Sequence, residues 1–178
     1  LALPPAPPLA EAIHTYIPDD VDSLIKPLNA LGPQSAAFGK VAHGRAADRH
    51  DFDHVNRSRL PFVATAAWLR DIDPDQPVAL FFGTNSPHVP WPAIDGYDPD
   101  KVIIPPFHID TPDTRDFRAR YYTDVTNADT HFARVTQLAD RYLGTANRIT
   151  VFSSDHGAQW PFGKWNLYDE GTRVPLVI

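Results

Sequence analysis

The sequence predicts an α/β fold in which a mainly parallel sheet is flanked by helices. Short apolar runs, typical of strands covered on both faces, alternate along the chain with segments in which apolar residues recur every three or four positions, typical of amphipathic helices. Of the 178 residues, 43% are hydrophobic and 21% are charged, which is the composition of a globular protein. Alternation of strand and helix is the pattern of a parallel sheet.

The chain opens with a proline-rich stretch, "LALPPAPPLA", for which we expect an irregular lead-in over residues 1–18, because proline fixes φ and removes a backbone donor. Residues 19–178 are expected to form one domain. A helix should begin after a cap at Asp19 or Asp20 and end at Gly32, with Pro27 introducing a kink. Its apolar positions are Val21, Leu24, Ile25, Leu28 and Leu31.

Two apolar runs in the first half predict strands. Residues 35–42 are small and apolar, and Gly39 is placed for a close approach of two backbones. Residues 77–85 form a continuous apolar strand bounded by turn residues. Between them, residues 60–72 show the period of an amphipathic helix that ends before Pro74.

The second half begins with a proline-rich loop over residues 86–113, and loops of this length usually cap or line a site. A long helix follows and ends at Gly144; its apolar face consists of Tyr121, Val125, Ala128, Phe132, Val135, Ala139 and Tyr142. Residues 148–155 and 173–178 are then predicted to be the last buried strands. The chain starts at Leu1 without methionine and stops inside an apolar run, so we expect a fragment that is incomplete at both ends.

The strand over residues 148–155 ends in Asp155-His156-Gly157. Ligands of open α/β sheets bind beyond the carboxyl ends of the strands, and Gly157 permits a turn that lets two consecutive side chains point to one place. A carboxylate beside an imidazole forms half of a divalent-cation site. The same three residue types are also common in turns, so a simple capped strand end is the alternative interpretation.

Composition excludes several classes of function. The formal net charge is −6 and there is no basic cluster, which argues against nucleic acid as a partner. The chain contains no cysteine, so disulfides, thiolate metal sites and a cysteine nucleophile are absent from these residues. No apolar run approaches the roughly 20 residues that span a bilayer. Any anion that binds must therefore find a local positive site.

Three segments carry a resemblance to a known family. "VFSSDHGAQWPFGKWNLYDEGTRVPLVI" resembles the signature of the sulfatase family in the alkaline-phosphatase superfamily, in which Asp-Asn-Gly or Asp-His-Gly ends a strand and a sulfate-binding lysine follows before G-x-R-x-P. "FGKVAHG" at residues 38–44 resembles the G-K-x-x-H segment of the family, and "TNSPHVPW" at residues 84–91 resembles its histidine loop. Their order agrees with the family, and residues 19–178 resemble part of its catalytic domain.

The resemblance assigns roles to six residues. Asp155 and His156 would be ligands of a divalent cation, Ca²⁺ with Mg²⁺ as the alternative, since a histidine in place of the usual asparagine leaves the ion less certain. His88 and Lys164 would hold the sulfate group of the substrate. The remaining two, Lys40 and His43, would border the catalytic residue. Together these lysines and histidines would supply the positive field that the acidic chain otherwise lacks.

Each of these residues also has an ordinary interpretation. Lys40 and Lys164 could be ordinary surface charges. His43 and His88 could be loop histidines whose hydrogen bonds are made with the backbone. The "HDFDH" segment, with His50, Asp51, Asp53 and His54, has the look of a zinc site but also that of an ordinary loop. The sulfatase interpretation is favoured only by the joint occurrence of Lys40, His43, His88 and Lys164 in the order of the family.

The nucleophile of the family is absent from these residues. Sulfatases use a formylglycine made from the Cys or Ser of a Cys/Ser-x-Pro-x-Arg motif, whereas this chain has no cysteine and no serine with proline two positions on. The pair of metal-binding aspartates at the first strand of the family also has no counterpart. In the family both elements precede the G-K-x-x-H segment, so truncation explains both absences.

The sequence therefore predicts part of a sulfatase whose full-length parent hydrolyses sulfate esters or sulfamates, with a look closest to heparan N-sulfatase and related carbohydrate sulfatases. The chain alone is expected to be inactive. Its partners would be a sulfated carbohydrate or another small sulfate ester, and the family resemblance suggests a periplasmic or secreted location. Two alternatives remain: a phosphonate or phosphate monoester hydrolase of the same superfamily, and a non-catalytic glycan-binding or assembly module.

Overall fold

The computed structural model describes residues 22–43, 46–73 and 75–178 of the chain. Contacts divide the chain into two compact units, residues 1–84 and residues 85–178, and each is described by itself. The proline-rich lead-in and the expected cap at Asp19 or Asp20 lie outside the described residues.

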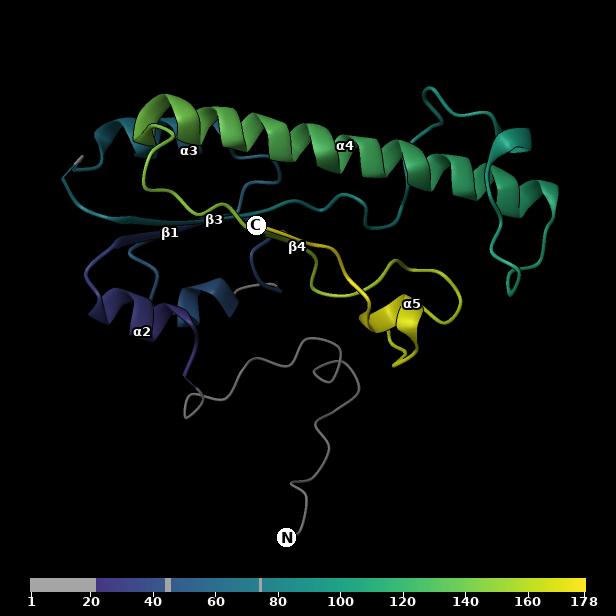
Figure 1. Ribbon diagram of the computed structural model, residues 1–178, viewed down its shortest axis with the longest axis horizontal. Coiled ribbons are helices and arrows are strands. Elements are labelled where there is room, and N and C mark those ends of the chain that lie inside the picture. Colours follow the sequence, from purple (N-terminus) through teal and green to yellow (C-terminus); the bar gives the residue numbers. More distant parts are fainter. Residues whose placement is uncertain (1–21, 44–45, 74) are drawn as a thin grey trace, which may run out of the picture. The chain divides into compact units, whose positions relative to one another are not determined.

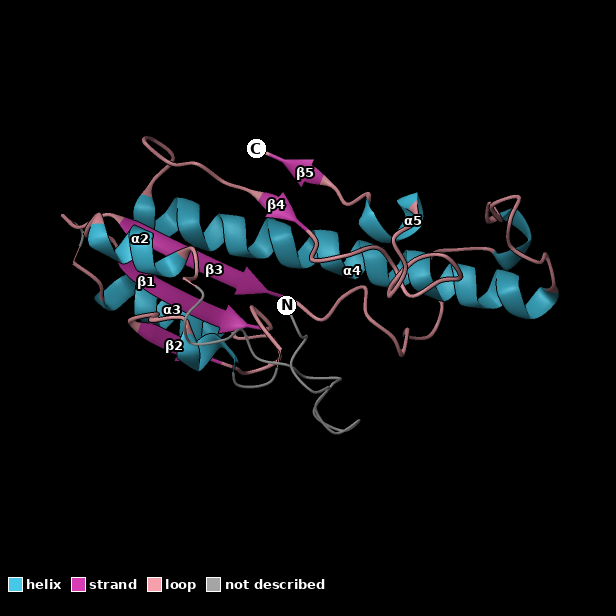
Figure 2. Cartoon of the chain, turned by 90° about the horizontal axis from the view of Figure 1, so that it is seen from below, coloured by secondary structure: helices cyan, strands magenta, loops and turns pink. Residues whose placement is uncertain are grey.

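The first unit contains a parallel sheet of three strands, β1 (Gln34–Gly39), β2 (His54–Asn56) and β3 (Val78–Gly83). Their order is β2-β1-β3, and both neighbouring pairs are parallel (Figure 2). The helices α2 (Ile25–Ala30) and α3 (Phe62–Asp71) lie on opposite sides of this sheet (Figure 1). This confirms the α/β fold class, a parallel sheet flanked by helices.

The core of the first unit lies on the central strand β1, where residues 35–38 are almost completely buried. Phe38 packs against Trp68 of α3, with ring centroids 5.9 Å apart, and Phe82 of β3 stacks on Phe62 at 5.1 Å. Because Phe38 and Phe82 are paired in register, both point to the same face. Strand β1 is thus buried as predicted, whereas β3, which was expected to be covered on both faces, is half-buried along its length.

Helix α2 is shorter than expected and begins at Ile25 rather than near Val21. Pro27 is the third residue of this helix, where the backbone N–H has no partner within the helix, so the ring breaks no hydrogen bond. The expected kink is therefore unnecessary. A short 3₁₀ helix, η1 (Ala46–Arg49), connects β1 to β2, and β2 itself lies in a segment that the sequence had suggested to be a loop.

Two glycines meet at the carboxyl edge of the sheet, where β1 and β3 end. Gly39 has a φ of 75°, and a Cβ at this position would lie 2.2 Å from the carbonyl oxygen of Gly83. A Cβ at Gly83 would in turn lie 2.0 Å from the carbonyl oxygen of Lys40. The backbone can therefore cross the end of β3, where the Lys40 amide donates to the Gly83 carbonyl at 2.9 Å. The close approach predicted at Gly39 is confirmed.

The second unit is built on one long helix, α4 (Pro112–Leu143). The Thr111 side chain caps it by accepting from the Thr114 amide, and Pro112 occupies its first turn, where no donor is lost. Gly144, with a φ of 75°, ends it as predicted. Before α4, the proline-rich segment is a loop with a single described 3₁₀ turn, η2 (Pro99–Lys101), again as expected.

The two C-terminal strands differ from the prediction. Strands β4 (Phe152–Ser153) and β5 (Leu176–Val177) pair with each other in antiparallel fashion, and between them lies a short helix, α5 (Asp169–Thr172). They are short and largely exposed rather than long and buried; Ile149 is 82% exposed. An apolar run indicates a strand, but it does not reveal whether another layer covers it. Among the described residues, no helix is both long and apolar enough to cross a membrane.

Candidate functional site

The first unit carries two of the predicted residues, Lys40 and His43, at the carboxyl edge of its sheet. Lys40 follows the Gly39 turn directly and is half-buried, whereas His43 is exposed. Carboxyl edges of parallel strands are where α/β proteins bind ligands. The position of both residues therefore agrees with a role at a site.

In the second unit, His88 is held by its loop. Its backbone amide donates to the Asn85 carbonyl at 2.6 Å, and Nδ1 lies 2.6 Å from the Val89 carbonyl. Because a carbonyl can only accept, Nδ1 carries the proton and Nε2 keeps its lone pair. The start of the loop is anchored to α4, where the Ser86 hydroxyl donates to the buried Asp124 carboxylate at 2.8 Å.

Lys164 contacts this histidine across a long stretch of sequence. Its Nζ lies 3.0 Å from His88 Nε2, so the ammonium group donates to the imidazole lone pair. Among the described residues, neither side chain forms an ion pair with a carboxylate. An ammonium group that donates one hydrogen bond to an imidazole keeps two further N–H groups, with which an oxyanion can form charge-assisted hydrogen bonds.

Three glycines shape the loop that carries Lys164. The Gly157 amide donates to the Gly171 carbonyl at 2.9 Å and closes the loop. A Cβ at Gly157 would lie 1.7 Å from the Glu170 carbonyl oxygen, and one at Gly163 would lie 2.2 Å from the Ala158 oxygen. A Cβ at Gly171 would meet another backbone oxygen at 2.2 Å. Side chains at these positions are thus excluded by backbone contacts, which fixes the path that presents Lys164.

Asp155 and His156 are brought together at the start of the same loop. His156 Nδ1 lies 2.8 Å from the Gly157 carbonyl, so it carries the proton and leaves the Nε2 lone pair available. That Nε2 lies 3.4 Å from Asp155 Oδ2. Two donor atoms at this spacing suit neighbouring ligands of one cation. Within the part of the chain that the structure describes, no third His, Cys, Asp or Glu joins them to complete a metal site.

An aromatic cluster connects the His88 loop to the Lys164 loop. Trp91 stacks on Trp160 with ring centroids 4.8 Å apart, and the Trp91 Nε1 donates to the Pro87 carbonyl at 3.0 Å. Tyr121 of α4 packs edge-on against both indoles. The contact between His88 and Lys164 is thus supported by a rigid aromatic platform next to it.

Arg118 of α4 is buried in this cluster, only 7% exposed, and the sequence interpretation did not single it out. Its guanidinium lies 4.1 Å from the Trp160 ring centroid and donates to His108 Nδ1 at 2.7 Å. Burial lowers the pKa of Arg118 and raises the pKa of Tyr121. One sequence signal could have revealed it, because Arg118 continues the apolar stripe three positions before Tyr121.

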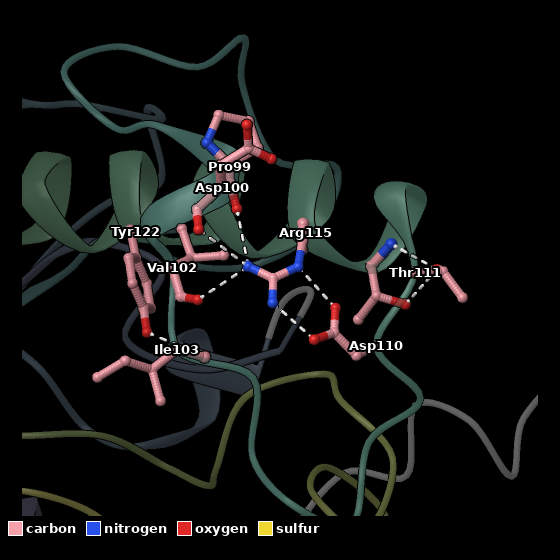
Figure 3. Close-up of polar contacts among 9 residues, drawn as sticks. Pro99, Asp100, Val102, Ile103, Asp110, Thr111, Arg115 and Tyr122 are labelled. Carbon is pink, nitrogen blue, oxygen red and sulfur yellow. Dashed lines mark hydrogen bonds and ion pairs between the residues drawn. The ribbon is translucent and has the colours of Figure 1, made fainter.

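The proline-rich loop is held against the start of α4 by Arg115 (Figure 3). Its guanidinium donates to both oxygens of Asp110, each at 2.6 Å. The remaining nitrogen, Nη1, donates to the carbonyls of Pro99, Asp100 and Val102 at 3.2–3.5 Å. The hydrogen bond to Asp110 and the charges of Asp110 and Asp100 raise the pKa of Arg115. Arg115 therefore fixes the loop without touching the candidate site.

The "HDFDH" segment has a structural explanation. The Asp53 carboxylate accepts from the Ser35 amide at 2.7 Å and from the Ser35 hydroxyl at 3.0 Å, which ties the segment to β1. The His54 ring stacks on Trp68, with ring centroids 6.2 Å apart, and contacts Phe38 at 5.2 Å with tilted planes. In the described structure, these residues form no cluster of three metal-binding side chains. Their arrangement supports the packing of the sheet rather than a zinc site.

Comparison with known proteins places most of the chain in one family. The profile of the Sulfatase family matches residues 59–178, which is more than half of the chain and includes His88, Asp155, His156 and Lys164. Residues Lys40 and His43 precede the matched segment.

Three individual relatives align with different shares of the chain. The chain is 26% identical to an ulvan-active sulfatase of Formosa agariphila over 178 aligned positions, which cover 93% of this chain and 34% of the relative. It is 39% identical over 83 positions to human N-sulphoglucosamine sulphohydrolase, covering 46% of this chain and 16% of the relative. A second ulvan-active sulfatase of F. agariphila is 29% identical over 120 positions, covering 58% of this chain and 23% of that protein. The chain spans about a third or less of the length of these relatives.

Proposed function

This chain belongs to the sulfatase family, and we propose that the complete protein hydrolyses the sulfate esters or sulfamates of a sulfated carbohydrate. The observation that carries the proposal is the contact of 3.0 Å between Lys164 Nζ and His88 Nε2. A bound sulfate group would accept hydrogen bonds from the N–H groups of Lys164 that do not point at His88, and this ammonium supplies a local positive site on a chain with a formal net charge of −6. The names of the relatives, two ulvan-active sulfatases and a sulphoglucosamine sulphohydrolase, support a carbohydrate substrate.

Asp155 and His156 would be two ligands of a divalent cation, and their geometry fits this role. The carboxylate oxygen and the imidazole lone pair lie 3.4 Å apart, and the other imidazole nitrogen is held by a backbone carbonyl. When bound, such a cation supplies positive charge that polarises an oxygen of the reacting group. Ca²⁺ is the ion we propose, with Mg²⁺ as the alternative; the further ligands would come from residues outside this set.

Lys40 and His43 would border the catalytic residue and stabilise negative charge there. In relatives the nucleophile is a formylglycine, and the residues of this chain include neither the cysteine nor the Ser-x-Pro-x-Arg motif from which it is made. We therefore propose that formylglycine is present in the complete protein and that the 178 residues alone are inactive. Determining the coding sequence upstream of Leu1 tests this directly. An Asp-Asp pair followed by Cys/Ser-x-Pro-x-Arg is expected, and an intact start codon at Leu1 would contradict it.

A substrate panel tests the function itself. The complete natural protein should release sulfate from sulfated mono- and oligosaccharides much faster than phosphate from the corresponding phosphate esters. Lys164→Ala and His88→Ala should each abolish most of this turnover, whereas Lys101→Ala, which alters an 83% exposed side chain on the same unit, should not. Faster release of phosphate would instead identify a phosphate or phosphonate hydrolase. Glycan binding without turnover that survives both alanine substitutions would identify a non-catalytic module.

A further inference from the structure

Trp165 is an exposed aromatic residue directly beside the lysine of the proposed sulfate site. The residue is 81% exposed, yet its ring centroid lies 5.2 Å from Lys164 Nζ. The same Nζ lies 3.0 Å from His88 Nε2. Trp165 therefore borders the position that an anion held by Lys164 and His88 would occupy.

The backbone of Trp165 is in an unfavourable conformation. Its φ is 72°, a value that residues with a Cβ rarely adopt, and Phe162 on the other side of Lys164 has a φ of 64°. Backbone hydrogen bonds hold this conformation: the Lys164 amide donates to the Ala158 carbonyl at 2.9 Å, and the Asn166 amide donates to the Gly163 carbonyl at 3.0 Å. Strain of this kind is concentrated at ligand sites.

Neither packing nor backbone preference explains a tryptophan at position 165. An indole that is mostly in water contributes little to the hydrophobic core, and glycine would satisfy the positive φ at no steric cost. What the indole does provide is a broad apolar face next to a cationic group. Such a face is complementary to a molecule that combines a negative charge with an apolar ring face.

We propose that Trp165 binds the sugar ring that carries the sulfate group, with the C–H face of a pyranose stacked on the indole. This inference rests on the proposed function and names the residue that would select a carbohydrate at the same site. A sulfate oxygen that accepts from Lys164 Nζ lies about 2.8 Å from it. A ring attached to that sulfate is then within contact distance of an indole centred 5.2 Å from the same nitrogen. Stacking on an aromatic face adds affinity and orients the ring.

The experiment compares Trp165→Gly and Trp165→Tyr in the complete natural protein. Trp165→Gly should raise the KM for a sulfated monosaccharide by about tenfold while changing kcat/KM for a small alkyl sulfate less than twofold. Trp165→Tyr should retain most of the sugar affinity, because it keeps an aromatic face. Leu167→Ala, which changes another exposed apolar side chain of the loop, is the matched control. Since glycine suits the positive φ, the melting temperature of Trp165→Gly should not fall.

Calorimetric titration separates failure of this inference from failure of the proposed function. Trp165→Gly should weaken binding of the sulfated monosaccharide about tenfold and leave binding of inorganic sulfate unchanged. That result in a protein that hydrolyses no sulfate ester would support the role of Trp165 and refute the hydrolytic function. Equal loss of affinity for both ligands would show that Trp165 only positions Lys164. This outcome, unchanged sugar binding in Trp165→Gly, or no sugar binding by the unaltered protein would each overturn the inference.

Discussion

Lys164 Nζ donates a hydrogen bond to His88 Nε2 over 3.0 Å, although 76 positions separate the two residues in the sequence. Both belong to loops, and the stacked pair Trp91 and Trp160 connects those loops a few residues away. The contact therefore depends on an aromatic platform rather than on strand pairing. Because the lysine donates and the histidine accepts, the two side chains are expected to act as one unit.

Substitution of this pair should reveal that coupling. Replacing Lys164 by glutamine removes the charged donor to a bound sulfate, and replacing His88 by glutamine removes the imidazole that holds this donor in place. A hydrogen bond to a charged group is worth about 1.5–3 kcal/mol. We expect Lys164→Gln and His88→Gln each to lower the kcat/KM for a sulfated monosaccharide by at least tenfold. The double variant should lose less than the sum of the single losses, because both residues act on one anion through the ammonium group of Lys164. Initial rates of sulfate release from all four proteins measure this, and strict additivity would argue against a shared anion.

The loop that carries Lys164 should tolerate no side chain at Gly157. Alanine there would place Cβ 1.7 Å from a backbone oxygen of Glu170, which no side-chain rotation relieves. We expect Gly157→Ala to lower the free energy of unfolding by about 3 kcal/mol or more. Gly96→Ala is the matched control, because Gly96 has a φ of 77° but nothing within 4 Å of its Cβ position, and the strain alone costs about 1–2 kcal/mol. Denaturant unfolding compares them; a smaller loss at Gly157 would mean that the loop closes differently.

Arg115 should not be replaceable by lysine. Its planar guanidinium reaches both oxygens of Asp110 and, with Nη1, the carbonyls of the proline-rich loop, as drawn in Figure 3. A lysine has a single nitrogen and cannot make both sets of contacts. We expect Arg115→Lys to lower the free energy of unfolding measurably. Arg120→Lys keeps an exposed ion pair with Asp116 and should cost less than about 0.5 kcal/mol, measured by the same denaturant titration.

His131 of α4 should make stability depend on pH. Burial lowers its pKa from 6.5, an effect that the charge of Asp124 opposes. The unfolded chain therefore binds more protons than the folded chain just below pH 6.5, and stability falls as pH falls through the lowered pKa. We expect unfolding measured from pH 7.5 to pH 5 to show a smaller loss of stability in His131→Gln than in the unaltered protein. An equal loss in both proteins would locate the pH dependence in other groups.

Local patterns in the sequence predicted those parts of the fold that depend on one segment at a time. The end of α4 follows from Gly144, whose conformational freedom acts within a few residues. The close approach at Gly39 followed in the same way from a glycine inside an apolar run. The burial of the last strands could not be predicted, because it depends on which element covers them.

The candidate site was predictable only as far as resemblance reached. Asp155, His156, His88 and Lys164 were named from motifs, and the structure places them in two contacting pairs. The aromatic and cationic cluster beside them was missed. In the sequence, Arg118 resembles a surface charge on a helix, and only its three-residue spacing to Tyr121 indicates otherwise. The contact of its guanidinium with the Trp160 ring is visible in the structure alone. Long-range contacts between loops leave no local signal in sequence.

Substitutions of Asp155 and His156 should weaken cation binding, and the size of the effect should depend on the side chain that is introduced. Asp155→Asn removes a charge and His156→Ala removes the Nε2 lone pair, so each should reduce the affinity of the complete protein for Ca²⁺ by about 10–100-fold. His156→Asn should retain more affinity than His156→Ala, because an amide oxygen suits a hard cation. Calorimetric titration with Ca²⁺ and with Mg²⁺ measures this without reference to turnover. Asp169→Asn, at the exposed start of α5, is the control. Unchanged Ca²⁺ and Mg²⁺ affinity in both Asp155→Asn and His156→Ala would contradict the cation site. The 3.4 Å between the two side chains would then be explained by the turn at the end of the strand alone.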